Sequence, residues 1–217
     1  MVFSGRFEGL EDADFDVFEV PGLEMRMEAL KAHLRPKLQQ LGEDFSSYLS
    51  DLLGIPMYAH VAKHARRTVN PPKDSWVAFS FDKRGYKKHA HFQIGAWQSH
   101  AFATFGLIYE SPLRQAYAAQ LRLHAAEIVN LVPSDYVWIP NYMDPGFISA
   151  AAVTADKLVE LADKMASGRQ GELLVGMQIP RDEAIALSPS EFEEKVATCF
   201  QTLAPLYEMA TKEGVAS

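Results

Sequence analysis

Trp76-Val-Ala-Phe-Ser-Phe81, His89-Ala-His-Phe-Gln-Ile-Gly-Ala-Trp97 and the nearly unbroken apolar run from Phe102 to Tyr109 are the segments that decide the fold of this 217-residue chain. In the first segment Val77, Phe79 and Phe81 alternate with smaller or polar residues, which predicts a β-strand. The connections between the segments are short, so we expect three strands paired as an antiparallel meander. The third run is apolar almost throughout, which favours a central position in the sheet.

Helical patterns lie on both sides of this meander. Apolar residues at helical spacing predict helices over residues 23–34, 36–54, 57–67, 111–131 and 154–168, and Ser188-Pro189 predicts the start of a long C-terminal helix. Further strands are expected at residues 136–139 and 173–179. The sum is a single α+β domain over residues 1–217, with helices packed on an antiparallel or mixed sheet of about five strands centred on the meander 76–109. The acidic residues 1–20 carry four phenylalanines and are expected to form an arm that packs onto the body.

The composition excludes several classes of protein. A single cysteine rules out an internal disulfide, and Cys199 lies in an amphipathic helical pattern that favours a small buried apolar role. The N-terminus lacks the apolar core of a signal peptide, and no run approaches the ~18 apolar residues of a membrane span, so we expect a cytoplasmic protein without a membrane partner. A net charge of −7 disfavours duplex DNA as a partner, while a short single-stranded nucleic acid stays open.

A reversal of charge marks the segment from His60 to His91. It holds eight Lys and Arg residues and only two Asp residues, so it carries +6 within a chain whose net charge is −7. Five of the seven histidines lie in this segment or just beyond it, and these are His60, His64, His89, His91 and His100. An acidic protein that gathers cations and imidazoles in one place is expected to hold an anion or a metal ion there.

The anion hypothesis is carried by the cations of a predicted helix end and a predicted hairpin turn. The guanidinium fork of arginine suits phosphate or carboxylate, and lysine adds point charge. Gly85 allows the backbone to approach a ligand, and an aromatic ring beside it can stack on a base. The candidate ligand-binding residues are Arg66, Arg67, Lys83, Arg84, Tyr86, Lys87 and Lys88. The alternative is that this turn is a solvated basic loop, because no known phosphate-loop pattern is present.

A metal site is the weaker alternative for the histidines. His60 and His64 have i, i+4 spacing on the predicted 57–67 helix, and His89 and His91 have i, i+2 spacing on a strand, so each pair is expected to share a face. No glutamate lies between the first pair, and no carboxylate recurs at ligand spacing nearby. Histidines that are hydrogen-bonded to their neighbours are therefore the favoured interpretation. The sequence leaves the identity of any cofactor unknown.

An acid–base site is a third possibility at the same place. A histidine beside arginines is expected to be neutral near pH 7 and able to accept a proton. The candidate bases are His60, His64 and His91, with Arg67 or Arg84 holding an oxyanion and Glu110 as a partner. This combination suits phosphoester or acyl chemistry, but no nucleophile motif specifies a reaction.

Several segments resemble one family of bacterial proteins. They are His60-Val-Ala-Lys-His-Ala-Arg-Arg-Thr-Val-Asn-Pro-Pro72, Ser75-Trp-Val-Ala-Phe79, Lys83-Arg-Gly-Tyr-Lys-Lys88 and His91-Phe-Gln-Ile-Gly95, with Asp14-Phe-Asp-Val-Phe18, Arg35-Pro-Lys-Leu38 and Tyr109-Glu-Ser-Pro112 outside the basic segment. On these residues the chain resembles the YktB-like family of uncharacterised bacterial proteins, over most of its length. The resemblance implies a compact α+β domain with no established activity, so it supplies no catalytic residues to carry over to this chain. The chain departs from the family pattern at His89-Ala90, where the family has an apolar residue and a proline, which places His89 outside the shared motif.

Two functional hypotheses follow. In the first, the protein binds an anionic small molecule or nucleotide between the 57–67 helix and the 83–91 hairpin, with hydrolase or transferase activity as an option. In the second, it is a non-enzymatic interaction domain whose basic face docks an acidic protein partner. A concave pocket with converging His and Arg side chains would favour the first hypothesis, and a flat face rimmed by apolar residues would favour the second.

Overall fold

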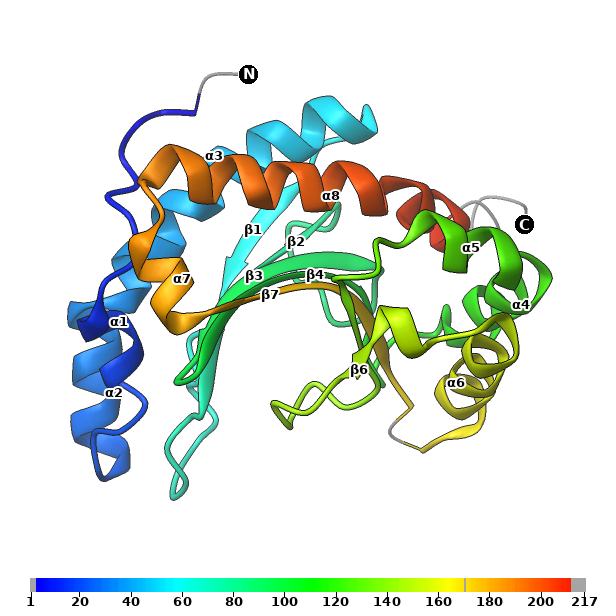
Figure 1. Cartoon of the computed structure of the whole chain (residues 1–217). Helices are drawn as coiled ribbons and strands as arrows, with labels where there is room; N and C mark the ends of the chain where they lie inside the picture. The colour runs from blue at the N-terminus through cyan, green and yellow to red at the C-terminus, as the bar shows by residue number, and fades with distance from the viewer. Residues whose placement is uncertain (1–2, 170, 212–217) are drawn as a thin grey trace.

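The computed structural model describes residues 3–169 and 171–211, and its centre is an antiparallel sheet (Figure 1). The seven strands found in these ranges are β1 (Tyr58–Val61), β2 (Asp74–Ser80), β3 (His91–Trp97), β4 (His100–Leu107), β5 (Val137–Ile139), β6 (Ile148–Ser149) and β7 (Leu173–Pro180). Their order in the sheet is β1-β2-β3-β4-β7-β5-β6. The predicted α+β class is confirmed, with seven strands in place of about five because the two short edge strands β1 and β6 were not expected.

The predicted meander is confirmed as β2, β3 and β4. Each strand pairs antiparallel with the next, and β4 lies between β3 and β7 in the middle of the sheet. The registers place Ala78 opposite Gln93 and Gln93 opposite Thr104. Since side chains alternate between the faces of a strand, these three residues lie on the same face.

Two long helices cover the opposite face. α3 (Leu34–Leu53) contacts β1, β2 and β3, and α8 (Pro189–Thr211) contacts β3, β4 and β7. Figure 1 shows both helices running across the same side of the curved sheet. The side chains beneath them are apolar and fully buried, among them Val77, Phe79, Phe92 and Phe105. This layer is the main hydrophobic core, and it includes Cys199, which is buried as predicted.

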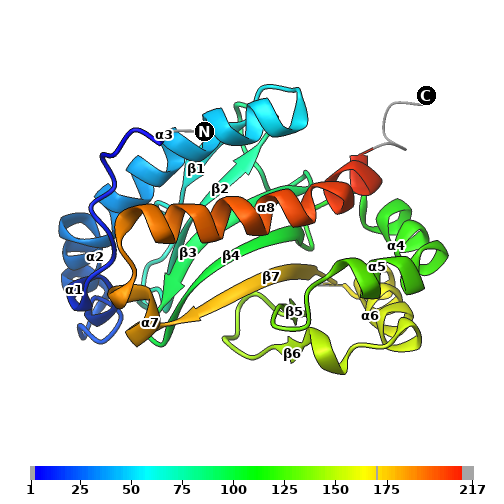
Figure 2. The same ribbon diagram turned by 45° about the horizontal axis from the view of Figure 1, so that its top comes forward.

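The remaining helices lie at the two ends of the sheet (Figure 2). α1 (Asp12–Asp16), α2 (Leu23–Ala32) and α7 (Arg181–Ala186) lie at one end, and α4 (Arg114–Leu123), α5 (Ala125–Leu131) and α6 (Ala155–Ser167) lie at the other, with the 3-10 turn η1 (Ala150–Ala152) following β6. The predicted N-terminal arm packs onto the body, because Phe7, Phe15 and Phe18 are buried in the main core. None of the helices in the described ranges is long and apolar enough to cross a membrane, and the cytoplasmic location stays a prediction.

The helix predicted over residues 57–67 is wrong. Residues 58–61 form the edge strand β1, which pairs with β2 so that His60 lies opposite Ala78, and residues 62–73 form an irregular loop. His64 in this loop has a φ of 51°, which a helix does not allow. The helical spacing of the apolar residues was outweighed by sheet pairing, since strand preference depends mainly on tertiary context. His60 and His64 therefore do not share a helix face.

Most other helix and strand boundaries agree with those predicted from the sequence. The predicted helix over 111–131 is divided at His124 into α4 and α5, whereas α6 begins as predicted, with Thr154 Oγ1 accepting a hydrogen bond of 3.2 Å from the backbone N–H of Lys157. Phe81 was expected to continue the buried face of β2, but it lies beyond the end of that strand and is 45% exposed.

The face of the sheet that α3 and α8 leave uncovered positions the candidate sites. Irregular segments cover it instead, namely the β2–β3 connection at residues 81–90 and the β5–β6 loop at residues 140–147. The strands approach closely there: a Cβ on Gly106 would lie 2.2 Å from the backbone oxygen of Leu173, and one on Gly176 would lie 2.1 Å from that of Ala103. Only glycine fits at these two positions, which lie on the strands that form the floor of the uncovered face.

Candidate functional site

The β2–β3 connection and the end of β1 form an open depression that we call the basic hollow. It encloses about 990 Å³ of unfilled space, counting its open side. Its lining residues are His60, Asp82, Arg84, Gly85, Tyr86, Lys87, Lys88, His89 and Glu110. Seven of the residues predicted from the sequence thus come together, because most of them lie within one short hairpin connection.

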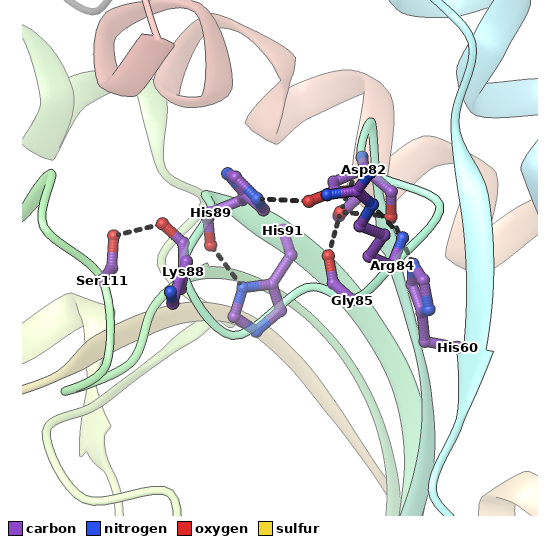
Figure 3. A network of polar contacts seen from close by, with 9 residues as sticks. His60, Asp82, Arg84, Gly85, Lys88, His89, His91 and Ser111 are labelled. Atoms are coloured by element: carbon purple, nitrogen blue, oxygen red, sulfur yellow. Dashed lines mark hydrogen bonds and ion pairs between the residues drawn. The ribbon is translucent and has the colours of Figure 1, made fainter.

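Asp82 fixes the shape of this connection (Figure 3). Its carboxylate accepts a hydrogen bond of 2.8 Å from the backbone N–H of Arg84 and lies 3.2 Å from Nε2 of His89. Its backbone oxygen accepts a hydrogen bond of 2.9 Å from Nε2 of His60 on β1. The backbone N–H bond and the contact with His89 lower the pKa of Asp82, so the carboxylate is ionised and already engaged at neutral pH.

The positive charges of the hollow are only partly matched. Lys87 Nζ forms an ion pair of 2.8 Å with Glu110. The predicted ligand-binding residue Lys83 does not line the hollow and lies over the ring of Tyr58 at 5.1 Å. Within the described part of the chain, no ion pair involves Arg84 or Lys88. These two side chains are therefore the cations left for an external anion.

His60 is the ring in the hollow that is best placed to accept a proton. Burial lowers its pKa, so the ring is neutral at pH 7. Because Nε2 donates to the backbone oxygen of Asp82, the neutral ring carries its lone pair on Nδ1. The neutral state was expected from the sequence, although burial rather than neighbouring arginine is its main cause.

His91 lies behind the hollow, fully buried under the ring of Tyr86 at a centroid distance of 4.8 Å. Its Nδ1–H donates to the backbone oxygen of His89 at 2.8 Å, and Nε2 accepts from the amide of Gln93 at 2.9 Å. Burial lowers the pKa of His91 to about 4. Since both ring nitrogens are engaged, His91 has no lone pair directed at the hollow.

Three predicted residues lie away from the hollow because the 62–73 loop carries them to another part of the molecule. His64 Nε2 is hydrogen-bonded to Ser75 Oγ at 3.2 Å, and burial together with Arg67 lowers its pKa to about 4. Arg66 is exposed to solvent. Arg67 lines a separate outer cleft of about 880 Å³, counting open solvent, whose lining residues are Arg26, Arg67, Asn70, Pro71, Lys73, Asp74, Trp97 and Met143. The expected convergence of Arg67 with Arg84 is therefore wrong.

The four candidate metal ligands do not gather into one site. Among the described residues, no group of three or more His, Cys, Asp or Glu side chains is arranged to hold a metal ion. His60 and His89 both approach Asp82, while His64 and His91 are bonded elsewhere.

A pocket lined by polar side chains on the uncovered face of the sheet was not predicted from the sequence. We call it the sheet-face pocket, and it is formed by Asp74, Gln93, Trp97, His100, Phe102, Thr104, Ile139, Tyr142, Asp144, Pro145, Leu174 and Gln178. The spacing of two residues between His91 and Gln93, and of four residues between His100 and Thr104, places these polar side chains on one face of a strand and was the available signal. In β4 the apolar neighbours concealed this spacing, since the strand is buried on both faces.

Comparisons with known proteins agree with the resemblance found in the sequence. A family model described as a domain of unknown function (DUF1054) matches residues 10–207. A UPF0637 protein of Bacillus cytotoxicus is 45% identical over 93% of this chain and 97% of the relative, and one of Lysinibacillus sphaericus is 46% identical over 90% and 92%. A third, of Bacillus velezensis, is 43% identical over 92% and 95%.

Proposed function

We propose that this chain, which belongs to the bacterial DUF1054 (UPF0637) family, binds a small anionic ligand in the basic hollow. The ligand is phosphorylated or nucleotide-like. The observation that carries the proposal is the charge balance of the hollow. Both of its carboxylates are engaged, Asp82 with the backbone and His89 and Glu110 with Lys87, whereas Arg84 and Lys88 have no ion-pair partner in the described ranges. Leaving the histidines aside, the three cations Arg84, Lys87 and Lys88 exceed the two carboxylates by one charge, which a bound anion would balance.

The geometry of the hollow suits a phosphate or carboxylate group. The guanidinium of Arg84 offers a bidentate contact and Lys88 adds a point charge. Gly85 leaves open space at the turn, since a Cβ there would meet no atom within 4 Å. Tyr86, half-buried in the wall, offers part of its ring to a base or another flat group.

An acid–base role adds to this proposal. Neutral His60 borders the same hollow as Arg84, so a proton acceptor and an anion holder lie side by side. This arrangement supports hydrolase or transferase chemistry on a bound ester, with His60 as the base. His64 and His91 are poorer candidates because their ring nitrogens are bonded within the protein.

The proposal is tested by the melting temperature of the protein in the presence of nucleotides, phosphorylated metabolites and short single-stranded RNA. A ligand at 100 times its Kd adds about 2.7 kcal/mol, which for a chain of this size raises the melting temperature by roughly 5–10 °C. The shift should disappear in Arg84→Ala/Lys88→Ala and persist in Arg66→Ala, a matched control on an exposed arginine outside the hollow. A shift that survives the double substitution would refute binding in the hollow.

A docking surface for an acidic protein is the second candidate function. The exposed Phe81 borders the connection that carries the cations, and the hollow is wide and open, as a docking face requires. If no small anion changes the melting temperature, affinity purification with the parent and the Arg84→Ala/Lys88→Ala variant distinguishes this candidate. An acidic partner retained only by the parent would support it.

A further inference from the structure

The sheet-face pocket lies between the uncovered face of the sheet and the β5–β6 loop. β3 and β4 supply Gln93, His100 and Thr104 from below, and Tyr142 and Asp144 close the pocket from the loop. The pocket comprises about 350 Å³ of unfilled space, counting open solvent, and only a small part of it is enclosed. An organic ligand therefore enters only when the loop moves.

Two buried polar atoms in this pocket have no partner among the residues that the structure describes. His100 is 7% exposed and Thr104 is 1% exposed, yet Nε2 of His100 and Oγ1 of Thr104 make no hydrogen bond to any of those residues. Buried polar groups are nearly always hydrogen-bonded, and leaving one unpaired costs about 1–3 kcal/mol. Both groups line the same pocket, so a single bound molecule can satisfy both.

The rest of the wall combines hydrogen-bonding and aromatic groups. Ser99 Oγ lies 2.9 Å from Nδ1 of His100 and holds that ring in place. The rings of Trp97, Phe102 and Tyr142 add flat apolar surface. Burial lowers the pKa of His100 to about 4, so the ring is neutral at pH 7. This inner wall therefore suits uncharged polar groups such as hydroxyls or amides.

A cationic cleft adjoins the pocket. Asp74 and Trp97 line both the sheet-face pocket and the outer cleft, and the cleft adds Arg26, Arg67 and Lys73. Arg26 is held by the backbone oxygens of Val20 and Pro72, at 2.8 and 2.9 Å. Burial raises the pKa of Asp74 to about 7, so this carboxyl adds only part of a negative charge at the junction. The three cations Arg26, Arg67 and Lys73 outnumber the two carboxyl groups Asp74 and Asp144 that line the pocket and the cleft.

We propose that the sheet-face pocket and the outer cleft form one binding site for a small organic anion, a carboxylate or phosphate ester whose uncharged end carries hydrogen-bonding groups. The uncharged end contacts His100 and Thr104, and the anionic group lies against Arg67 and Lys73. The site is distinct from the basic hollow, since their lining residues do not overlap. The two are separated by Trp76 and Tyr86, which are joined by a hydrogen bond of 3.1 Å.

The first experiment needs no ligand. Thr104→Val keeps the shape of the side chain and removes the unpaired hydroxyl, so the melting temperature of the free protein should rise by about 2–12 °C. Thr198→Val is the matched control, because Thr198 is exposed on α8 and donates to the backbone oxygen of Glu194. An unchanged or lower melting temperature for Thr104→Val would overturn the proposal, since the hydroxyl would then be satisfied without a ligand.

The second experiment maps binding by amide NMR spectra with ribose 5-phosphate, 3-phosphoglycerate, gluconate, citrate and a nucleoside monophosphate as probes. At least one should shift the signals of residues 100–104 together with that of Arg67. Thr104→Val and Arg67→Ala should each weaken that binding about tenfold, whereas Arg84→Ala, in the basic hollow, should leave it unchanged. The same variants distinguish this site from the basic hollow, because binding in the hollow depends on Arg84 and Lys88 and not on Thr104 or Arg67.

Two outcomes would overturn the proposal. In one, no probe shifts the signals of residues 100–104. In the other, inorganic phosphate shifts the signal of Arg67 as strongly as the organic probes do while residues 100–104 stay unaffected, which would mean that the outer cleft attracts anions without a pocket behind it.

Discussion

The two faces of the same sheet differ in what they bury. Beneath α3 and α8 the strands present Val77, Phe79, Phe92 and Phe105, all fully buried and apolar. On the opposite face the same strands bury Asp74, His91, Gln93, His100 and Thr104. An apolar face under helices contributes stability, whereas buried polar groups cost free energy unless they are paired. The difference indicates that the helix-covered face contributes most of the stability, and buried polar groups on the uncovered face are consistent with the binding site proposed there.

The largest effect is expected from truncating the helix-covered face. Phe92 is fully buried and its ring packs on Phe105, Phe200 and Tyr207. Phe92→Ala should lower the free energy of unfolding by about 3–5 kcal/mol, measured by urea denaturation. Phe102→Ala, on the uncovered face beside the pocket, is the control and should cost less. Equal losses of unfolding free energy in the two variants would contradict the conclusion that the helix-covered face contributes more stability than the uncovered face.

Asp74 should make the protein less stable as the pH rises. Burial raises its pKa to about 7 from an ordinary value near 3.8, so the native state binds more protons than the unfolded state between these values and stability falls with rising pH through that window. Asp74→Asn removes this dependence. Between pH 4.5 and 7.5 the variant should lose about 3 kcal/mol less stability than the parent. The measurement is the free energy of unfolding at several pH values, and identical slopes would contradict a buried, protonated Asp74.

His91 should make the protein less stable as the pH falls, which is the opposite of the effect of Asp74. Its pKa is lowered from 6.5 to about 4, so the unfolded state binds more protons and stability falls as the pH drops from 6.5 to 4. His91→Gln should reduce the loss between pH 7 and 4.5 by about 2 kcal/mol. Acid unfolding followed by circular dichroism checks this, with His33→Gln, at an exposed histidine, as the control. An acid profile that matches the parent would show that His91 is not the buried neutral ring described above.

The smallest effect is expected at the link between the uncovered face and the basic hollow. Trp76→Phe removes the hydrogen bond from Nε1 to Tyr86 Oη and should cost about 1 kcal/mol of unfolding free energy. If Tyr86 is fixed by this bond, ligand binding in the basic hollow should also weaken, measured by the same melting-temperature shifts. Unchanged stability would show that this hydrogen bond makes no net contribution.

The elements that could be predicted carry their signals within their own sequence. Thr154 caps α6 with its own side chain, Ser188 precedes α8 and Pro189 begins it, and the strands of the meander alternate or run apolar over seven or eight residues. The edge strand β1 could not be predicted in the same way. It is four residues long and exists because β2 lies beside it, so local spacing suggested a helix.

The same distinction applies to the candidate sites. The basic hollow could be predicted because Arg84, Tyr86, Lys87 and Lys88 lie in one short connection. The sheet-face pocket requires the register of four strands, which brings Asp74, Gln93, Thr104 and Gln178 to one face. Register is set by pairing across the sheet and not by any single segment. Arg67 was misplaced for a related reason, since a loop between two strands was taken for a helix.

The position of β7 has a consequence for how the chain folds during synthesis. β7 pairs with β4 on one side and β5 on the other, although it begins 66 residues after β4 ends, and α8 follows it at the end of the chain. A nascent chain that has completed β4 therefore lacks both the neighbouring strand and one of the two helices that cover the meander. Pairing between distant segments is slow, and an uncovered strand edge favours aggregation. The synthesis of β7 and α8 is thus the step that allows the sheet and its helix-covered core to close.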